Sequence, residues 1–307
     1  MKTALITGVA GFLGRHVLRQ FSREGWRVIG LDDVPPENAP KAENAEFHRV
    51  KLPDAALAIL LRDEKPDVCV HCAGRASVAL SIEDPAADFA ANTTLTFELL
   101  DLLRRESPRC RFLFLSSAAV YGNPESLPIA EDAICAPLSP YGYHKRQGEL
   151  LCEEFARIYG LPTASARIFS AYGPGLRRQV VWDICERVLT TGSLTLRGTG
   201  EESRDFIHAA DVARALFHLA QKAPCEGEIY NVASGVEITL KELAERLVAA
   251  LGSSVQPRFD GTTPTGDPRN WRADVRKLHE LGFAPTIPLA QGIQAVAAWA
   301  RAELVLA

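Results

Sequence analysis

The sequence predicts an α/β fold, in which a doubly wound parallel sheet is followed by a smaller C-terminal α/β cap. Short apolar runs alternate with helical stretches through the first half of the chain, and such alternation specifies parallel strands joined by right-handed crossovers. A glycine-rich turn lies directly between the first apolar run and its helix. After Gly173-Pro174-Gly175 the alternation becomes irregular, which predicts the cap.

Each expected strand in the first half is a short run rich in apolar residues, as parallel strands buried on both faces should be. The strands are Thr3–Thr7, Arg27–Leu31, Glu46–Val50, Val68–Cys72, Arg111–Ser116 and Thr163–Phe169. The helical stretches between them are Phe12–Arg23, a short helix around 55–62, about Asp88–Arg105, and Tyr143–Tyr159. We therefore expect residues 1–168 to form one α/β unit.

The second half has fewer and less regular elements. The expected helices are Val181–Thr190, Asp211–Ala220 and Leu240–Leu251, and the expected strands are Leu194–Arg197 and Glu228–Val232. No internal repeat or low-complexity linker separates this half from the first. We expect residues 169–307 to pack against the first unit, with about 209–233 returning to its sheet.

Length and composition exclude several classes of protein. The 307 residues suffice for one large domain or two smaller ones, and 47% hydrophobic with 23% charged residues excludes a disordered, collagen-like or coiled-coil chain. The net charge of -4 provides no electrostatic footprint for nucleic acid or an anionic membrane. Gly8 interrupts the N-terminal apolar run too early for a signal peptide, and no run reaches the roughly 18 apolar residues of a membrane span. We expect a cytoplasmic protein with no nucleic-acid or membrane partner.

The cysteines indicate neither a disulfide framework nor a metal site. There are seven, an odd number, and they are scattered along the chain. Cys69 and Cys72 flank His71 in a CVHC spacing, but they lie in an expected strand. Since a strand alternates its side chains, the two thiols would point to opposite faces and could not share a metal.

A phosphate-binding turn is predicted by the segment TGVAGFLG, which contains Gly8, Gly11 and Gly14. Glycines between a strand and a helix let backbone N–H groups approach a pyrophosphate, which then lies on the positive end of the helix. The second strand ends in Asp32 and Asp33, where an acid accepts hydrogen bonds from adenosine ribose hydroxyls. Because an acid repels a 2′-phosphate, NAD is favoured over NADP.

Two other uses of such glycines are excluded by the surrounding residues. A P-loop ends in Lys and then Ser or Thr, whereas Gly14 is followed by Arg15 and His16. A serine-hydrolase elbow has a glycine on each side of the serine, and no serine of this chain has that pattern.

The segment SPYGYHK places Tyr141 and Lys145 four residues apart at the start of a helix, so their side chains share a face. A free tyrosine, with a pKa of about 10, is a poor base at pH 7. A neighbouring ammonium and a cationic nicotinamide would stabilise the phenolate and let it take a hydroxyl proton. Ser117, just past an expected strand, would lie near this phenol at the carboxyl edge of the sheet. Tyr143 is a rival phenol, but its spacing to Lys145 is wrong for a shared face.

Together these motifs resemble those of the extended short-chain dehydrogenase/reductases, specifically the NAD-dependent nucleotide-sugar epimerase/dehydratase group and its UDP-glucose 4-epimerase-like members. TGVAGFLG, LDD, SSAAVYG, SPYGYHK and RIFSAYGPG occur in the family's order, and RGTGEESRDFIHAADVARAL, YNVASG and GDPRNWRADVRKLHELGF continue the match. The resemblance spans nearly the whole chain. It implies a Rossmann fold, with residues 1–168 as the NAD-binding domain and 169–307 as the substrate-binding region.

The resemblance also implies roles for individual residues. The catalytic residues would be Ser117, Tyr141 and Lys145, with Asn92 supporting them. The residues that would hold NAD are Gly8, Gly11, Phe12, Leu13, Gly14, Asp32, Asp33, Leu52, Ala73, Gly74, Asn92, Tyr141 and Lys145. The residues that would bind the substrate are Ser117, Tyr141, Ser170, Arg204 and Arg269, with Arg177, Arg178 and Arg272 as further candidates for its diphosphate.

The segment after Ser117 favours one of the family's reactions. Members that dehydrate or decarboxylate carry an Asp or Glu there as an extra acid or base, whereas this chain has Ala118 and Ala119. What remains is C4 epimerisation of a nucleotide-diphosphate sugar, with a UDP-sugar favoured, through a transient 4-keto intermediate. The alternatives are an NAD(P)H-dependent 4-keto-sugar nucleotide reductase and a non-catalytic NAD-binding regulator.

Two positions depart from the family's pattern. Ser170 stands where an Asn usually contacts the substrate diphosphate, and Lys51 stands where an Asp usually meets the adenine. We therefore expect an atypical substrate pocket and an adenine that is held differently.

The family often forms homodimers by pairing the two helices expected at about 88–105 and at 143–159. The apolar residues available for such pairing are Phe97, Leu100 and Leu103 on the first helix and Leu151, Phe155 and Ile158 on the second, although packing on their own sheet explains some of them. We therefore expect a homodimer.

Overall fold

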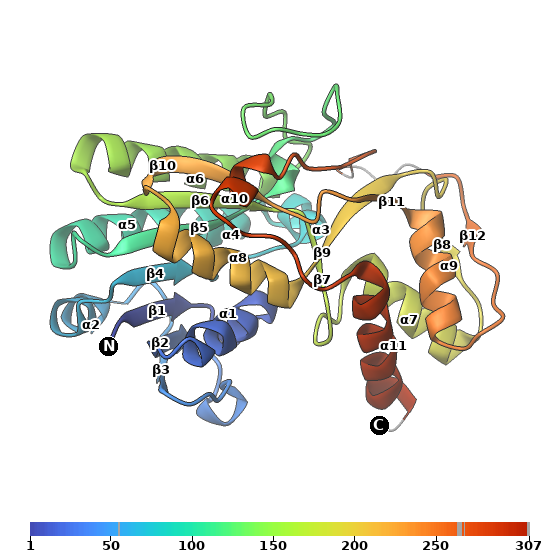
Figure 1. Cartoon of the computed structure of the whole chain (residues 1–307), viewed down its shortest axis with the longest axis horizontal. Helices are drawn as coiled ribbons and strands as arrows, with labels where there is room; N and C mark the ends of the chain where they lie inside the picture. Colours follow the sequence, from blue (N-terminus) through green and yellow to red (C-terminus); the bar gives the residue numbers. More distant parts are fainter. Residues whose placement is uncertain (55, 263–265, 267, 306–307) are drawn as a thin grey trace.

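The computed structural model describes residues 1–54, 56–262, 266 and 268–305. Its larger part is a seven-stranded sheet in the order β10-β6-β5-β4-β1-β2-β3 (Figure 1), and all neighbouring strands in it are parallel. The strands are β1 (Thr3–Thr7), β2 (Arg27–Asp32), β3 (Ala45–Arg49), β4 (Val68–His71), β5 (Arg111–Ser117), β6 (Thr163–Ile168) and β10 (Glu226–Val232). The predicted α/β class with a doubly wound parallel sheet is confirmed.

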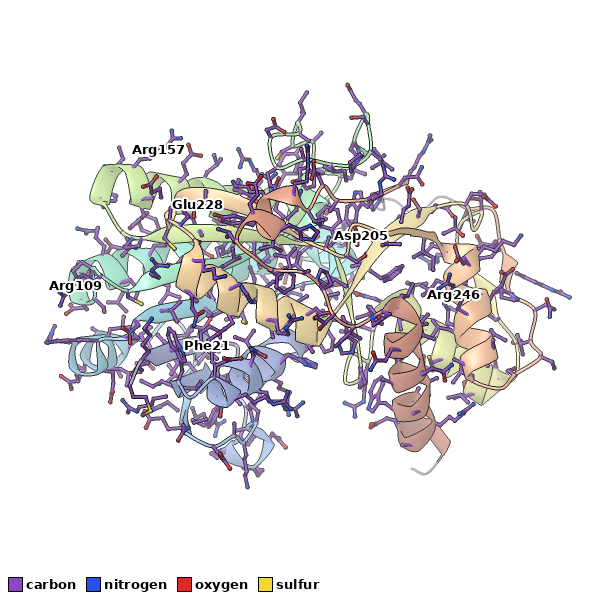
Figure 2. All side chains as sticks on the ribbon, viewed as in Figure 1. Phe21, Arg109, Arg157, Asp205, Glu228 and Arg246 are labelled. Carbon is purple, nitrogen blue, oxygen red and sulfur yellow. The ribbon has the colours of Figure 1, made fainter. Side chains whose placement is uncertain are left out.

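Helices cover both faces of this sheet because each strand sends alternate side chains to opposite sides. Ile6 packs with Phe21 of the first helix on one face, while its neighbour Leu5 packs in a separate cluster on the other. Phe21 is labelled in Figure 2 and is fully buried. The helices are α1 (Phe12–Arg23) and α8 (Ala209–Lys222) on the first face, and α2 (Ala56–Glu64), α5 (Leu95–Glu106) and α6 (Pro140–Tyr159) on the second.

The order of the strands reverses beside β1. From β1 the chain builds outward through β2 and β3 on one side, and then through β4, β5 and β6 on the other. The loops that follow β1 and β4 therefore diverge and leave a crevice at the carboxyl ends of the strands, which is where ligands bind in this class of fold.

Two helices differ from the predicted ones. α6 begins at Pro140, three residues earlier than expected, because the Ser139 hydroxyl caps it by accepting a hydrogen bond from the Gly142 N–H at 3.3 Å. The helix expected at about 88–105 is instead α4 (Pro85–Phe89), a π-helical turn η2 (Ala90–Thr94) and α5. In the helix expected around 55–62, Ala55 lies outside the described residues.

Most of the second half of the chain forms a cap beside the sheet, on the right of Figure 1, whereas β10 belongs to the large sheet and α8 packs against it. The small sheet of the cap has the order β11-β9-β7, and three helices share a core that includes Trp182, Leu247 and Ile293. One of these helices, α11, is absent from the prediction. The elements of the cap are β7 (Ser170–Tyr172), α7 (Gln179–Thr191), β8 (Thr195–Leu196), β9 (Ser203–His208), β11 (Glu237–Thr239), α9 (Leu240–Ala250), β12 (Arg258–Phe259) and α11 (Leu289–Val305). The remaining short elements are η1 (Pro36–Asn38), α3 (Val78–Glu83), η3 (Ala118–Val120) and α10 (Arg276–Glu280).

Asp205 on β9 joins the cap to the large sheet, and Figure 2 labels it between the two. Its carboxylate is fully buried and accepts hydrogen bonds from the Ser234 N–H at 2.8 Å, the Ser234 hydroxyl at 2.7 Å, the Gly235 N–H at 2.9 Å and the Ala273 N–H at 3.1 Å. Ser234 and Gly235 follow the last strand of the large sheet. One buried acid therefore fixes the chain where it passes from the sheet into the cap.

All seven cysteines are free thiols. Cys69 packs under α2 and α5, whereas Cys72 packs on the opposite face of the sheet, as the alternation of a strand requires. Within the described ranges, no three His, Cys, Asp or Glu side chains gather as a metal ion would need. In the same ranges no helix has the length and apolar character to cross a bilayer.

Candidate active site

The turn between β1 and α1 leaves no room for side chains. Gly8 has a φ of +65°, and a Cβ there would lie 2.6 Å from the Ala73 nitrogen. A Cβ on Gly14 would lie 2.1 Å from the Gly8 carbonyl oxygen, which also accepts a hydrogen bond from the Gly11 N–H at 3.0 Å. This crowding requires glycine and brings the main chain of the turn against the end of β4.

The N-terminus of α1 is suited to a pyrophosphate. Gly11 is its N-cap and provides no side chain to bond the first N–H groups, and the first turn contains no acid. The N–H groups and the helix dipole therefore favour an anion there. Asp32, at the end of β2, accepts hydrogen bonds from the Ala10 N–H and the Asp33 N–H, each at 2.9 Å, so its negative charge lies beside this turn. An anion-binding turn with an acid beside it fits NAD.

The opposite wall of the crevice comes from β4 and the π-helical turn. The Ala73 N–H donates to the Thr7 hydroxyl at 3.2 Å. Gly74 has a φ of +140°, and a Cβ there would lie 2.7 Å from the Asn92 Oδ1. Asn92 is buried and donates to the Arg75 carbonyl at 3.0 Å, while its Oδ1 has no hydrogen-bond partner within the described structure. A buried acceptor without a partner at this position fits a bound polar group.

Four other residues were assigned to the cofactor from the sequence, and they lie on α1 and in the loops after β2 and β3. Phe12 and Leu13 form the first turn of α1 and are half-buried. Asp33 is exposed after β2. Leu52 follows β3, packs against the core under α2 and α5, and lines a cavity of about 260 Å³ there.

Tyr141 lies in the first turn of α6, next to the turn that follows Ser117, the last residue of β5. The helix approaches that turn closely, because a Cβ on Gly142 would lie 2.7 Å from the Ala119 carbonyl oxygen. The Ser117 hydroxyl lies close enough to the Tyr141 phenol to lower its pKa. Tyr143, the rival phenol, is 55% exposed on the outside of α6. The structure therefore brings Ser117 to Tyr141 and turns Tyr143 away.

Lys145 completes the group from the next turn of α6. It is buried, with its Nζ 5.9 Å from the centre of the Tyr141 ring and 4.9 Å from that of Phe114. Burial lowers the pKa of Lys145 to about 8, and the charge of Asp88 opposes this. Burial raises the pKa of Tyr141, while the Ser117 hydroxyl lowers it. Burial is the larger of the two effects on Tyr141.

The expected phosphate-binding arginines lie on the cap side of the crevice. Arg204 is on β9, where it donates to the Ser203 carbonyl at 2.8 Å and the Arg269 carbonyl at 3.0 Å. Its guanidinium lies 5.5 Å from the centre of the Trp271 ring, whose N–H donates to the Gly122 carbonyl at 3.0 Å. The structure therefore brings the main chain of Arg269 to the Arg204 side chain, beside the loop that follows Ser117.

Comparison with known proteins identifies the family. A family model described as the NAD dependent epimerase/dehydratase family matches residues 4–233. A UDP-glucose 4-epimerase of Mycolicibacterium smegmatis is 33% identical, over 94% of this chain and 95% of its own. The chain belongs to the NAD-dependent epimerase/dehydratase family.

Solved structures of this family have the same fold over almost their whole length. The UDP-glucose 4-epimerase of Thermotoga maritima, solved with UDP-glucose, is 31% identical with a TM-score of 0.90, and the match covers 98% of this chain and 99% of that one. The UDP-glucose 4-epimerase of Thermus thermophilus, solved with NAD, is 29% identical with a TM-score of 0.88, over 97% and 99% of the two chains. NAD is therefore the cofactor of this family member.

Both departures from the family's pattern lie at the carboxyl edge of the sheet. Ser117 pairs in register with Ile168, so Ser170 at the start of β7 lies two residues further along the same edge. Ser170 is half-buried, and its short side chain leaves more space than an Asn would. Lys51 is exposed in the loop after β3.

Two contacts near this family's catalytic positions were not predicted from the sequence. His144 Nδ1 lies 2.6 Å from the fully buried carboxylate of Asp88, which places a buried acid against α6 beside Lys145. Arg178 donates to the Ala76 carbonyl at 2.7 Å, and its charge lowers the pKa of Tyr141 after the larger effects of burial and Ser117. Each contact joins residues far apart in the chain, so local spacing gave no sign of it.

Of the other candidate arginines, Arg177 is ion-paired with Glu303 of α11 and lies over the Trp299 ring at 5.9 Å. That pairing holds its guanidinium on the cap helix. Arg178 is therefore the member of this pair that reaches the crevice.

Proposed function

We propose that this chain is an NAD-dependent epimerase that inverts C4 of a nucleotide-diphosphate sugar through a transient 4-keto intermediate. The observation that carries the proposal is the grouping of Ser117, Tyr141 and Lys145 at the end of the NAD crevice. The turn η3 that follows Ser117 contains Ala118 and Ala119 in place of a carboxylate. The site therefore has one proton shuttle and no second acid in that turn for an elimination.

The side chains of this protein would transfer the proton of the O4 hydroxyl and bind its oxygen. Tyr141 accepts the proton of the O4 hydroxyl, and Ser117 donates a hydrogen bond to the same oxygen while the C4–O4 bond becomes a carbonyl. Bound NAD supplies a reversible hydride acceptor for C4. Lys145 orients the cofactor's ribose and contributes positive charge near the phenolate. When the keto sugar presents its other face, Tyr141 returns its proton to O4, and the product is the C4 epimer.

We propose that residues 1–168, with 209–233, form the NAD-binding domain and that the rest of 169–307 binds the substrate. Arg204 and Arg269 would contact the diphosphate, because guanidinium groups bind phosphate oxygens in a two-pronged geometry. A UDP-sugar is favoured, since the relatives and neighbours include UDP-glucose and UDP-glucuronate 4-epimerases. Ser170 would give the pocket more room near the diphosphate than an Asn would.

The proposed function is tested with the purified protein and no added cofactor. UDP-glucose, UDP-N-acetylglucosamine and UDP-glucuronate are each incubated with it, and the products are separated by chromatography and identified by NMR. We expect one or more to be converted to the C4 epimer, and Tyr141→Phe to abolish the conversion.

The same preparation separates the epimerase from its alternatives. An epimerase regenerates its cofactor in each turnover, so NAD should co-purify with it. Stoichiometric consumption of added NADH on a 4-keto sugar, with no epimer from any UDP-sugar, would identify a reductase instead. Catalysis that is lost in Lys145→Ala dismisses a non-catalytic NAD-binding regulator.

We also propose that the chain forms a homodimer through the outer faces of α5 and α6. Phe97, Leu150 and Ile158 are 46%, 47% and 71% exposed on these faces, so apolar side chains are available there for contact with a second copy. Of the apolar residues named from the sequence, Leu100, Leu103 and Phe155 are buried in the chain's own core against the sheet, because each lies on the inner face of its helix.

A cytoplasmic location is the last part of the proposal. It is supported by the seven free cysteines, five of which are buried, since a reducing compartment keeps such thiols unpaired. Fractionation of cells that express a tagged copy tests it, and recovery of the tag outside the cytoplasmic fraction would contradict it.

A further inference from the structure

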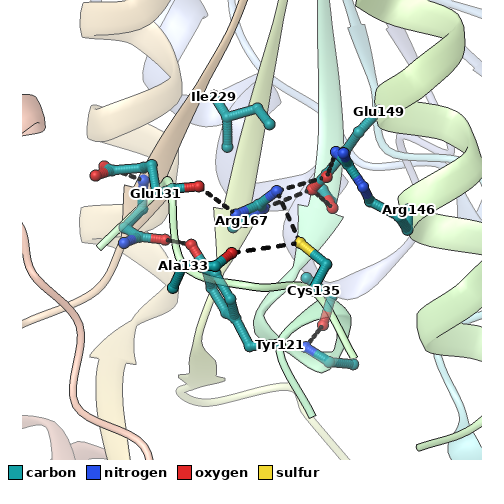
Figure 3. Close-up of polar contacts among 12 residues, drawn as sticks. Tyr121, Glu131, Ala133, Cys135, Arg146, Glu149, Arg167 and Ile229 are labelled. Carbon is teal, nitrogen blue, oxygen red and sulfur yellow. Dashed lines mark hydrogen bonds and ion pairs between the residues drawn. The ribbon is translucent and has the colours of Figure 1, made fainter. Parts of the chain in front are cut away.

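Outside the proposed catalytic group, the protein buries a complete ion pair between the sheet and α6. Arg167 on β6 is 1% exposed and Glu149 on α6 is 2% exposed. The Arg167 Nε donates to Glu149 Oε1 and a terminal nitrogen donates to Oε2, each at 2.8 Å, so the two groups form a two-pronged pair (Figure 3). A buried ion pair often contributes less to stability than apolar residues of the same volume would. Stability alone therefore does not explain why the protein buries the ion pair of Arg167 and Glu149.

The carboxylate of Glu149 links α6 to β5 beside the catalytic residues. It accepts a third hydrogen bond from the Ser116 hydroxyl at 2.6 Å and a fourth from Arg146 at 2.9 Å. Ser116 immediately precedes Ser117, and Glu149 lies one helical turn after Lys145. The same carboxylate thus holds the strand that carries Ser117 and the helix that carries Lys145.

The guanidinium of Arg167 holds the segment that leads into α6. It donates to the Glu131 carbonyl at 2.8 Å and to the Cys135 sulfur at 3.4 Å, and it lies 4.6 Å from the centre of the Tyr121 ring. Figure 3 shows these contacts converging on the one guanidinium. The Tyr121 hydroxyl in turn donates to the Asn231 side chain on β10 at 2.7 Å. All these groups lie between the end of β5 and the start of α6, or pack against that segment.

We propose that Arg167 and Glu149 are positioning residues, which set the start of α6 against the end of β5 so that Tyr141 and Lys145 meet the oxygen held by Ser117. The inference rests on the proposed epimerase function for its kinetic readout. Neither residue touches substrate or cofactor in this role. Apolar side chains could fill the same space, but they would allow α6 to slide along β5, whereas directed hydrogen bonds hold the helix at one position.

The test replaces the whole pair, because removal of one partner leaves an unpaired buried charge that can prevent folding. The double variant Arg167→Met with Glu149→Leu keeps the volume and removes both charges. The matched control is Arg157→Met with Glu153→Leu, an ion pair on the same helix whose side chains are 71% and 35% exposed. Thermal unfolding, kcat, KM and the pH dependence of kcat are measured for both.

We expect the buried double variant to stay folded, with kcat lowered at least tenfold and KM changed by less than about threefold. Ser116→Ala, which removes the hydrogen bond between β5 and Glu149, should lower kcat by a smaller factor. The charge of Glu149 raises the pKa of Lys145, after the larger effect of Asp88, so Glu149→Gln should move the alkaline limb of kcat to lower pH. The control pair should change none of these. A stable double variant with wild-type kcat would overturn the proposal.

A crystal structure of the double variant gives a readout that needs no activity. The proposal expects the first turn of α6 to shift by about 0.5 Å or more relative to the end of β5, since catalytic groups are held to about that tolerance. An unshifted first turn would overturn the positioning role. If the wild-type protein converts no nucleotide-sugar, the proposed function is refuted. The crystallographic test of the position of α6 can still be made, because it does not depend on activity.

Discussion

Gly142 provides a direct test of how closely α6 must approach the loop after Ser117. In Gly142→Ala the new Cβ would lie 2.7 Å from the Ala119 carbonyl oxygen and 2.9 Å from the Pro137 Cβ. Real Cβ atoms do not come within 3.0 Å of such atoms, so the first turn of α6 must move away by at least 0.3 Å, and by 0.7 Å to reach an ordinary 3.4 Å contact. Tyr141 moves with that turn.

The expected effect follows from the size of this movement. A displacement of about 1 Å in a reacting group costs roughly 100-fold in rate, so a few tenths of an ångström should lower kcat about tenfold. Stability should change little, because alanine favours a helix over glycine by about 1 kcal/mol and offsets part of the clash. Loss of kcat with an almost unchanged unfolding temperature is therefore the expected result.

The assay is the initial rate of epimer formation at saturating UDP-sugar, with urea unfolding measured in parallel. Ser139→Ala is the control, because it removes the cap of the same helix without a clash and should lower the free energy of unfolding by about 1 kcal/mol. Its kcat should stay within about threefold of wild type. If Gly142→Ala retains kcat within twofold, the close approach of α6 has no catalytic importance and the reasoning is wrong.

Four further outcomes are expected. Gly14→Ala puts a Cβ 2.1 Å from the Gly8 carbonyl oxygen, so the NAD content of the purified protein should fall at least tenfold; full occupancy would contradict the turn's role. The pKa of Lys145 is lowered to about 8 by burial, so its ammonium is lost as pH rises through that value, and kcat should decline above about pH 8; a flat profile to pH 10 would count against it. Asp205→Ala leaves buried N–H groups without an acceptor and should lower the free energy of unfolding by about 3 kcal/mol in urea titrations. Ile158→Glu places a charge on the exposed face of α6 and should convert a dimer to a monomer in light scattering; an unchanged mass would place the interface elsewhere.

The sequence could predict those parts of the fold that depend on local pattern. The apolar run Thr3–Thr7 and the glycines after it are adjacent in the chain, and the strand and tight turn that they form are equally local. Tyr141 and Lys145 share one helical face, so their spacing sufficed to pair them. These are short-range consequences of backbone geometry.

The rest depends on partners that are distant in the chain. The hydrogen bonds of Asp205 span 29 to 68 residues, and Arg167 meets Glu149 across two different elements, so the periodicity of a single element reveals neither contact. An acid or a guanidinium in the sequence looks like a surface residue until its partner is known. The same reason explains why Leu100 and Leu103 were expected at an interface, since an apolar helix face does not say which surface covers it.

The path of the chain between its two halves limits how the protein can come apart. The chain leaves the large sheet after β6, returns for α8 and β10, leaves again at β11, returns for α10 and ends in α11. The cap is therefore not an appendage on a single linker, and neither half is a continuous segment that could be expressed alone. We expect the two halves to unfold in one cooperative transition. A chain cut before α11 should lose the core of the cap, although it still contains all the strands of the NAD-binding sheet.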